Sequence, residues 1–124
     1  MNTQTKRVLV VEDNVDAADL LAEALRAKGH EVLVAHAPLV ALGLISAFRP
    51  EVALLDLGLP DMDGFDLARR IIQSCADCRL IAVTGYGDEA TRVRAHETGF
   101  VAHLVKPVTA AVLLAAITDV TTVE

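Results

Sequence analysis

The chain has 124 residues, of which 53% are apolar and 23% are charged, so it has the length and composition of one globular domain. Its 11 basic and 17 acidic residues give a formal charge of −6, which disfavours nucleic-acid binding because a phosphate backbone is also negative. No apolar run reaches the roughly 20 residues that span a bilayer, and residues 1–7 are too polar for a signal peptide. We therefore expect a cytoplasmic protein that contacts no membrane and binds proteins or small ions.

Five short apolar runs predict five strands. They lie at residues 8–11, 31–35, 52–55, 80–83 and 101–105. The first, third and fourth are continuous rather than alternating, which is typical of strands buried on both faces of a parallel sheet. We expect tails at 1–5 and 121–124, with a single domain over 6–120.

Segments with helical spacing alternate with these runs. Apolar residues share one face from Leu20 to Leu25 and again from Phe65 to Cys75, and Gly29 is expected to end the first helix. A more polar helix is expected over 88–98, and Thr109 is expected to cap a last helix. Five strands alternating with five helices predict an α/β fold, with one doubly wound parallel sheet covered by helices on both faces.

Polar residues stand where the predicted strands end. Ligands of open parallel sheets bind beyond the carboxyl ends of the strands, so these residues are the candidate site. They are Glu12 and Asp13 after the first run, Asp56 after the third, Thr84 after the fourth and Lys106 after the fifth. Three carboxylates, one hydroxyl and one ammonium are therefore expected at one edge.

Three carboxylates in one cleft repel each other unless a cation lies among them. Oxygen ligands without nearby histidine or cysteine favour a hard cation that keeps several waters, so we expect Mg²⁺ or Mn²⁺. A simpler role for single acids is helix capping, by Asp13 or Asn14 before the first helix and by Asp61 or Asp63 before the third. Capping does not account for Asp56, which ends a buried strand.

A carboxylate beside a metal can attack phosphorus and form an acyl phosphate. The Thr84 hydroxyl could then donate to a phosphoryl oxygen, and the Lys106 ammonium could neutralise its charge. Taken singly, these two residues could instead be an ordinary strand end and a solvated cation.

Four segments together resemble the receiver domains of two-component response regulators. They are VLVVED (8–13), VALLDLGLPDMDG (52–64), VTGYGD (83–88) and GFVAHLVKPV (99–108). The resemblance covers nearly the whole chain. It implies the flavodoxin-like, CheY-like sheet with strand order 2-1-3-4-5.

The resemblance also implies roles for site residues. Asp56 would be the phosphoacceptor, and Asp13 and Asp56 would ligate Mg²⁺ directly. Glu12 would act through a bound water, and the backbone carbonyl of Gly58 would complete the protein ligands. Thr84 and Lys106 would bind the phosphoryl group, and the Lys106–Pro107 peptide bond is expected to be cis.

Partners are implied in the same way. The phosphoryl donor would be a histidine kinase or a histidine phosphotransfer protein, and the phosphorylated form would act on a downstream target protein as a monomer or a phosphorylation-dependent dimer. The family's switch pairs the strand-four hydroxyl, here Thr84, with a Tyr or Phe, for which this chain has His103. His103 could equally be a half-exposed strand residue without a switching role. Gly58 and Gly85 are expected to leave the site open to water and to a partner's histidine, although turn geometry could also explain them.

Other signals carry less weight. Cys75 and Cys78 fall at the end of a helix, where the dipole opposes thiolate formation, so we expect no redox or metal role. We expect three histidines, His30, His36 and His96, to lie on the surface. We expect four arginines, Arg69, Arg70, Arg92 and Arg94, to lie on solvated helix faces.

Two other functions remain open. A metal-dependent aspartyl-phosphate phosphatase or phosphotransferase would need a second acid two residues after its nucleophile, where this chain has Gly58. A non-phosphorylated pseudo-receiver would serve only for docking. On the favoured interpretation the chain is no enzyme for an external substrate, and it is either a stand-alone regulator or the receiver segment of a hybrid histidine kinase.

Overall fold

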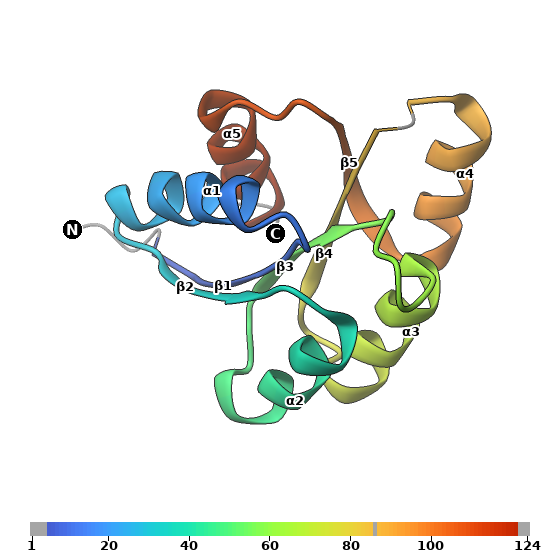
Figure 1. Cartoon of the computed structure of the whole chain (residues 1–124), viewed down its shortest axis with the longest axis horizontal. Helices are drawn as coiled ribbons and strands as arrows, with labels where there is room; N and C mark the ends of the chain where they lie inside the picture. The colour runs from blue at the N-terminus through green and yellow to red at the C-terminus, as the bar shows by residue number, and fades with distance from the viewer. Residues whose placement is uncertain (1–4, 86, 122–124) are drawn as a thin grey trace.

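The structure, a computed structural model, describes residues 5–85 and 87–121 as five strands alternating with five helices (Figure 1). The strands are β1 (Arg7–Val11), β2 (Glu31–Ala35), β3 (Val52–Asp56), β4 (Arg79–Thr84) and β5 (Phe100–Val105). The helices are α1 (Val15–Ala27), α2 (Pro38–Phe48), α3 (Gly64–Ser74), α4 (Glu89–Thr98) and α5 (Ala110–Thr121). All strand pairs are parallel and the order is β2-β1-β3-β4-β5, which confirms the predicted fold.

Helices cover both faces of the sheet. Figure 1 shows α1 and α5 on one side and α2, α3 and α4 on the other. Each side has its own apolar core, with Leu25 and Ile117 in one and Ile45 and Ile71 in the other. Every residue of the central strand β3 is buried, as the continuous apolar run predicts. The carboxyl ends of β1 and β3 are therefore fixed next to each other by packing on both faces.

Side-chain caps begin four of the helices. Asn14 accepts a hydrogen bond from the Ala17 N–H, so Asn14 and not Asp13 caps α1. Asp63 caps α3 in the same way, Asp88 caps α4, and Thr109 caps α5 as expected. Because none of these caps uses Asp13 or Asp56, helix capping does not explain either carboxylate.

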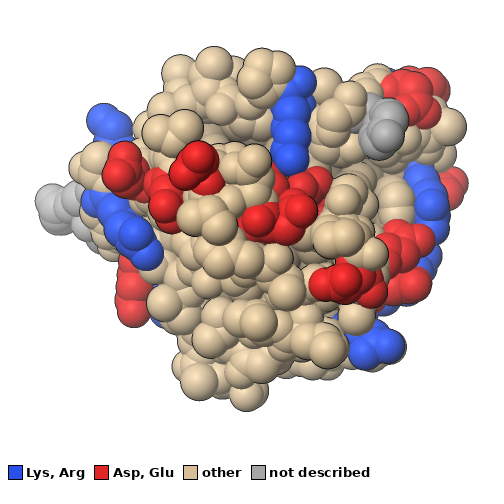
Figure 2. Space-filling model, in the orientation of Figure 1, with Lys and Arg blue, Asp and Glu red and all other residues tan. Residues whose placement is uncertain are grey.

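The helix α2 contains no charged residue. Leu39 and Val40 are exposed on its outer side, and Figure 2 shows neither acidic nor basic side chains over α2 on that face. Because this helix is apolar on every side, its sequence lacks the one-sided periodicity that would have predicted its bounds.

The described elements fill most of the expected domain. The helix α5 runs to Thr121, one residue beyond the expected boundary at 120. The tail residues 1–4 and 122–124, and Tyr86 of the VTGYGD segment, lie outside the described residues. Among the helices of residues 5–85 and 87–121, none is long and apolar enough to cross a membrane.

The two cysteines and Arg94, for which no functional role was expected, have structural roles. Cys75 and Cys78 are buried free thiols, and burial, followed by the charge of Cys75, raises the pKa of Cys78 to about 12. Arg94 does more than face solvent, because its guanidinium lies 4.0 Å from the ring centre of Phe65 and 3.3 Å from an Asp63 carboxylate oxygen. Arg94 therefore ties α4 to the start of α3.

Candidate functional site

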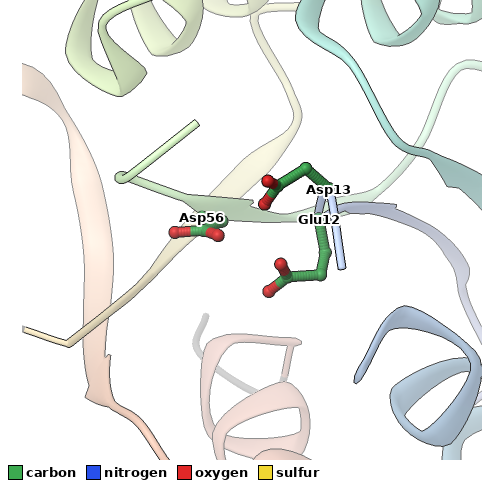
Figure 3. A group of neighbouring side chains, drawn as sticks. All are labelled: Glu12, Asp13 and Asp56. Atoms are coloured by element: carbon green, nitrogen blue, oxygen red, sulfur yellow. The ribbon is translucent and has the colours of Figure 1, made fainter. Parts of the chain in front are cut away.

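Three carboxylates meet at the carboxyl edge of the sheet. Glu12 and Asp13 follow β1, Asp56 ends β3, and these two strands pair directly. One carboxylate oxygen from each residue lies within 4.8 Å of the other two, and Figure 3 shows the side chains turned toward a common space. Glu12 and Asp56 are buried, with 3% and 6% of their surface exposed, whereas Asp13 is exposed. The site is thus buried on one side and open on the other.

Lys106 faces two of these carboxylates. Its Nζ lies 3.0 Å from Glu12 Oε1 and 3.0 Å from Asp56 Oδ2. The backbone N–H of Lys106 donates to the Thr84 carbonyl at 2.8 Å, which fixes the residue just beyond the end of β5. The following peptide bond, Lys106–Pro107, is cis, as expected from the resemblance. In Figure 2 acidic side chains lie near the middle of this face with a basic side chain beside them.

Burial, hydrogen bonds and neighbouring charges shift the pKa values of Glu12 and Lys106. Burial raises the pKa of Glu12 above its ordinary value, and the nearby charge of Asp56 adds to this, although hydrogen bonds from Asn14 and Lys106 oppose it. Burial alone would lower the pKa of Lys106, but hydrogen bonds to Glu12 and Asp56 and their charges raise it overall. The surroundings of Lys106 therefore favour its protonated form, and those of Glu12 disfavour its ionised form.

Glu12 is positioned by two neighbours. The Asn14 N–H donates to Glu12 Oε2 at 3.0 Å, and the His36 ring Nδ1 lies 2.9 Å from the Glu12 carbonyl oxygen. His36 follows β2 directly, next to β1. His36 is exposed, as expected from the sequence, but its contact with Glu12 was not predicted. The useful signal was its position, since it follows a predicted strand beside the one that carries Glu12.

Asp56 is held from both sides. Its Oδ1 accepts a hydrogen bond from the Gly58 N–H at 2.8 Å, while its Oδ2 faces Lys106. A Cβ added to Gly58 would stand 3.5 Å from Asp56 Oδ1, and one added to Gly85 would meet no atom within 4 Å. Apart from the chain neighbours of Gly85, no described residue therefore fills the space at this position.

Thr84 and His103 lie on adjacent strands. Thr84 ends β4 and is buried, while His103 is on β5 opposite Ala82, two positions before the partner of Thr84. Both ring nitrogens of His103 are buried without a hydrogen-bond partner among the described residues. The structure therefore places Thr84 at the same edge as the carboxylates and His103 further back along the sheet.

The donor set suits a hard divalent cation. Among residues 5–85 and 87–121, the Lys106 ammonium forms ion pairs with Glu12 and Asp56 and none with Asp13, so the negative charge of the three carboxylates is only partly compensated. Both oxygens of Glu12 and both oxygens of Asp56 already accept a hydrogen bond or face Lys106, whereas Asp13 is the exposed member of the cluster. Oxygen ligands of this kind are those that Mg²⁺ prefers.

Comparisons with known proteins agree with this geometry. The chain is 30% identical over 102 residues to the sporulation initiation phosphotransferase F of Bacillus subtilis, covering 82% of each chain. It is 35% identical over 112 residues to the acid tolerance regulatory protein ActR of Rhizobium meliloti, covering 90% of this chain but 58% of that relative.

Solved structures give the same picture. A CheY-like response regulator receiver domain protein from Methanospirillum hungatei has a TM-score of 0.87 at 31% identity, covering 93% of this chain and 92% of that one. A response regulator from Burkholderia pseudomallei, solved with a phosphorylated aspartic acid and a calcium ion, has a TM-score of 0.84 at 33% identity, covering 94% and 71%.

The family of response regulator receiver domains has a sequence model that matches residues 8–118, which includes every candidate site residue. Receiver domains are signalling domains of two-component systems, they generally use Mg²⁺, and their partners are histidine kinases or phosphotransfer proteins. With this match over most of its length, the chain belongs to the response regulator receiver domain family.

Proposed function

We propose that Asp56 accepts a phosphoryl group from a phosphohistidine of a partner protein, in a reaction that depends on a divalent cation. The observation that carries this proposal is the setting of Asp56: a buried carboxylate with the Gly58 N–H at one oxygen and Lys106 at the other. Such fixed donors orient a carboxylate for attack. The space at Gly85, which no described residue apart from its chain neighbours fills, supports access for a partner's imidazole.

The transfer is a substitution at phosphorus. An Asp56 oxygen forms the new P–O bond while the P–N bond to the partner's imidazole breaks, and the bonding pair leaves with the imidazole nitrogen. Lys106 would stay beside the phosphoryl group as a positive charge, and the Thr84 hydroxyl would donate to one of its oxygens. Mg²⁺ or Mn²⁺, held by Asp13, Asp56 and the Gly58 carbonyl, with Glu12 acting through a water, would supply further charge neutralisation.

Two relatives support this assignment. The Burkholderia structure carries a phosphorylated aspartic acid together with a divalent cation, and the Bacillus relative is named a phosphotransferase. On this proposal the domain is no enzyme for an external substrate, because the phosphoryl group remains on its own side chain until water removes it. A phosphatase with a second acid is disfavoured, since Gly58 stands at the position where that acid would be needed.

Phosphorylation would be read by a downstream protein. We propose that Thr84 moves toward the phosphoryl group and that His103 responds, which would change the surface around α4 and β5. The ring nitrogens of His103 support this: they are buried and have no hydrogen-bond partner within residues 5–85 and 87–121, so no hydrogen bond from these residues holds the ring in place. A phosphorylation-dependent dimer is one form such an output could take.

The proposal also covers the bounds of the functional unit and the kind of protein in which it acts. The functional unit would span residues 6–120, which contains the matched range 8–118. Because the chain spans 58% of ActR and 46% of the DNA-binding response regulator MtrA of Mycobacterium tuberculosis, outputs named for those proteins need not apply to it. The receiver could act alone or within a hybrid histidine kinase.

Intact-mass measurement tests the proposal. The folded protein is incubated with phosphoramidate and Mg²⁺, beside a sample with EDTA, an Asp56→Asn variant and an Asp61→Asn variant that removes an exposed acid from the next loop. One phosphoryl adduct is expected in the wild type and in Asp61→Asn, and none with EDTA or Asp56→Asn. Folded protein without an adduct under every condition would favour the pseudo-receiver.

A further inference from the structure

A cavity lies at the end of the sheet opposite the carboxylate cluster. It has a volume of about 360 Å³ and is lined by residues that begin or precede strands or follow helices, with Pro50 and Cys75 among them. The six charged lining residues are Lys6, Arg7, Arg49, Glu51, Asp77 and Arg79. Because β1 rises about 3.3 Å per residue, its far end at Glu12 is about 16 Å away, so this cavity is separate from the carboxylate cluster.

The cavity is positive in a negative protein. Four cations and two carboxylates give its lining a formal charge of +2, whereas the whole chain carries −6. Arg7 and Glu51 compensate each other, with Arg7 NH1 3.7 Å from Glu51 Oε1. Within the described part of the chain, Lys6, Arg49 and Arg79 have no carboxylate at ion-pair distance, since no salt bridge joins them to an acid. The excess of +2 therefore comes from these three cations together with the Asp77 carboxylate, which no salt bridge of the described residues pairs either.

The wall of the cavity is rigid. The Glu51 N–H donates to the Arg7 carbonyl at 2.8 Å and the Arg79 N–H donates to the Glu51 carbonyl at 2.9 Å, so these three residues stand side by side across the sheet. The Arg7 guanidinium is fixed by Nε hydrogen bonds to the Phe48 and Arg49 carbonyls at 3.0 and 2.9 Å. Because the Arg7 guanidinium is already fixed, it loses little conformational entropy when an anion binds.

Arg49 is an unexpected residue at its position. It ends α2 with φ of +49°, in the left-handed region that favours glycine, and glycines take the positive φ after α1 and α4. Glycine at position 49 would adopt this positive φ without the steric strain that a Cβ causes. The chain instead carries a guanidinium there, and that guanidinium lines the cavity.

Helix ends account for only part of this charge. Cations near the carbonyl ends of helices are stabilising, and Arg7 has this role because it binds the last carbonyls of α2. Arg79 begins a strand and Lys6 precedes one, so neither residue belongs to the last turn of a helix. Two or more cations therefore remain for a ligand.

We propose that this cavity binds a small phosphate monoester as its dianion. Guanidinium groups match the paired oxygens of a phosphate, and the charge of a dianion equals the excess of the lining. The volume falls within the range of small-molecule sites of about 300–1,000 Å³, so the cavity has room for the organic part of such a ligand. The site goes beyond the phosphoacceptor function and does not depend on it.

The test is a titration of isotope-labelled protein with ribose 5-phosphate, followed by amide NMR shifts in EDTA at constant ionic strength. Saturable shifts are expected at Glu51, Asp77 and Arg79, and not at Gly58 beside Asp56. Succinate serves as a dianion without a phosphoryl group. Equal binding of succinate would overturn the proposal in favour of carboxylate ligands such as an acidic peptide, and shifts that do not saturate or that centre on Gly58 would also overturn it.

Two variants separate binding from folding. Arg49→Gly removes the cation at a position where glycine is favoured, so we expect unchanged or higher thermal stability with at least about tenfold weaker binding. Arg79→Gln should weaken binding similarly, while Arg69→Gln, an exposed arginine paired with Asp66 on α3, should leave it unchanged. Equal binding by Arg49→Gly and the wild type, or equal losses in all three variants, would refute the site.

Discussion

Replacing Lys106 by Met should destabilise the metal-free domain. Its ammonium faces Glu12 Oε1 and Asp56 Oδ2, both at 3.0 Å, on side chains that are only 3% and 8% exposed. Hydrogen bonds to charged groups contribute about 1.5–3 kcal/mol each. Because the Lys106 side chain is 37% exposed, solvent screening reduces this, and we expect a total loss of about 2 kcal/mol at pH 7.

Thermal unfolding measures this loss. For a domain of this size, about 2 kcal/mol corresponds to a fall in Tm of roughly 6–10 °C. The control is Lys28→Met, which removes an exposed lysine at the end of α1. Since the pKa of Lys106 is raised above 10.5, the difference between wild type and Lys106→Met should be complete at neutral pH and vanish as pH rises through that raised pKa.

Mg²⁺ should partly rescue the Lys106→Met variant. In the variant, the three carboxylates have lost the positive charge of Lys106. A cation bound among them replaces that charge, so Mg²⁺ should raise the Tm of the variant more than that of the wild type. Equal stability of Lys106→Met and Lys28→Met would show that the ammonium does not stabilise the cluster. An equal effect of Mg²⁺ on the variant and the wild type would show that the ion and the ammonium act on different groups.

Three further measurements test other parts of the structure. Gly64→Ala should lower the free energy of unfolding by about 1–3 kcal/mol, because its Cβ would lie 2.8 Å from Leu57 Cα, whereas Gly43→Ala in α2, with no atom within 4 Å, should raise it by about 0.5–1 kcal/mol. Urea unfolding distinguishes the two, and losses of equal size would contradict the packing at Gly64. Cys78, studied in a Cys75→Ser background, should react with iodoacetamide at pH 8 far more slowly in the folded than in the unfolded protein. The reason is that a pKa of about 12, against an ordinary value of 9.0, reduces the thiolate fraction roughly a thousandfold. Rapid labelling of the folded protein would show that the thiol is accessible and ionised. His103→Leu should raise the free energy of unfolding by about 1 kcal/mol, since it removes two buried nitrogens without partners. A loss of stability in that variant would mean that the packing contacts of the imidazole ring contribute more free energy than the burial of its two nitrogens costs.

The acidic edge could be predicted because the first, third and fourth apolar runs are continuous and each is followed directly by a polar residue, and because the weaker fifth run is followed by Lys106. In a parallel sheet those endings meet, so the amino-acid order alone groups Asp13, Asp56 and Lys106. The bounds of α2 could not be predicted in this way, because a helix that is apolar on every side has no period. The contact of His36 with the Glu12 carbonyl was not predicted either; the only signal for it was the position of His36 directly after the strand beside β1, because a backbone acceptor does not depend on the side chain of the residue that carries it.

The basic cavity could not be predicted for a related reason. Arg7, Glu51 and Arg79 begin or precede strands and are separated by dozens of residues, so only the sheet order brings them together. The same order explains why opposite charges gather at opposite ends. Each helix runs back against the strands, so helix N-termini point toward the carboxylate edge and C-termini toward the other end. Helix dipoles favour anions at the first edge and cations at the second, as the Asn14 N–H at Glu12 and Arg7 at the end of α2 illustrate. One arrangement of backbone dipoles therefore favours a cation-binding acidic cluster at one end of the sheet and an anion-binding basic cavity at the other.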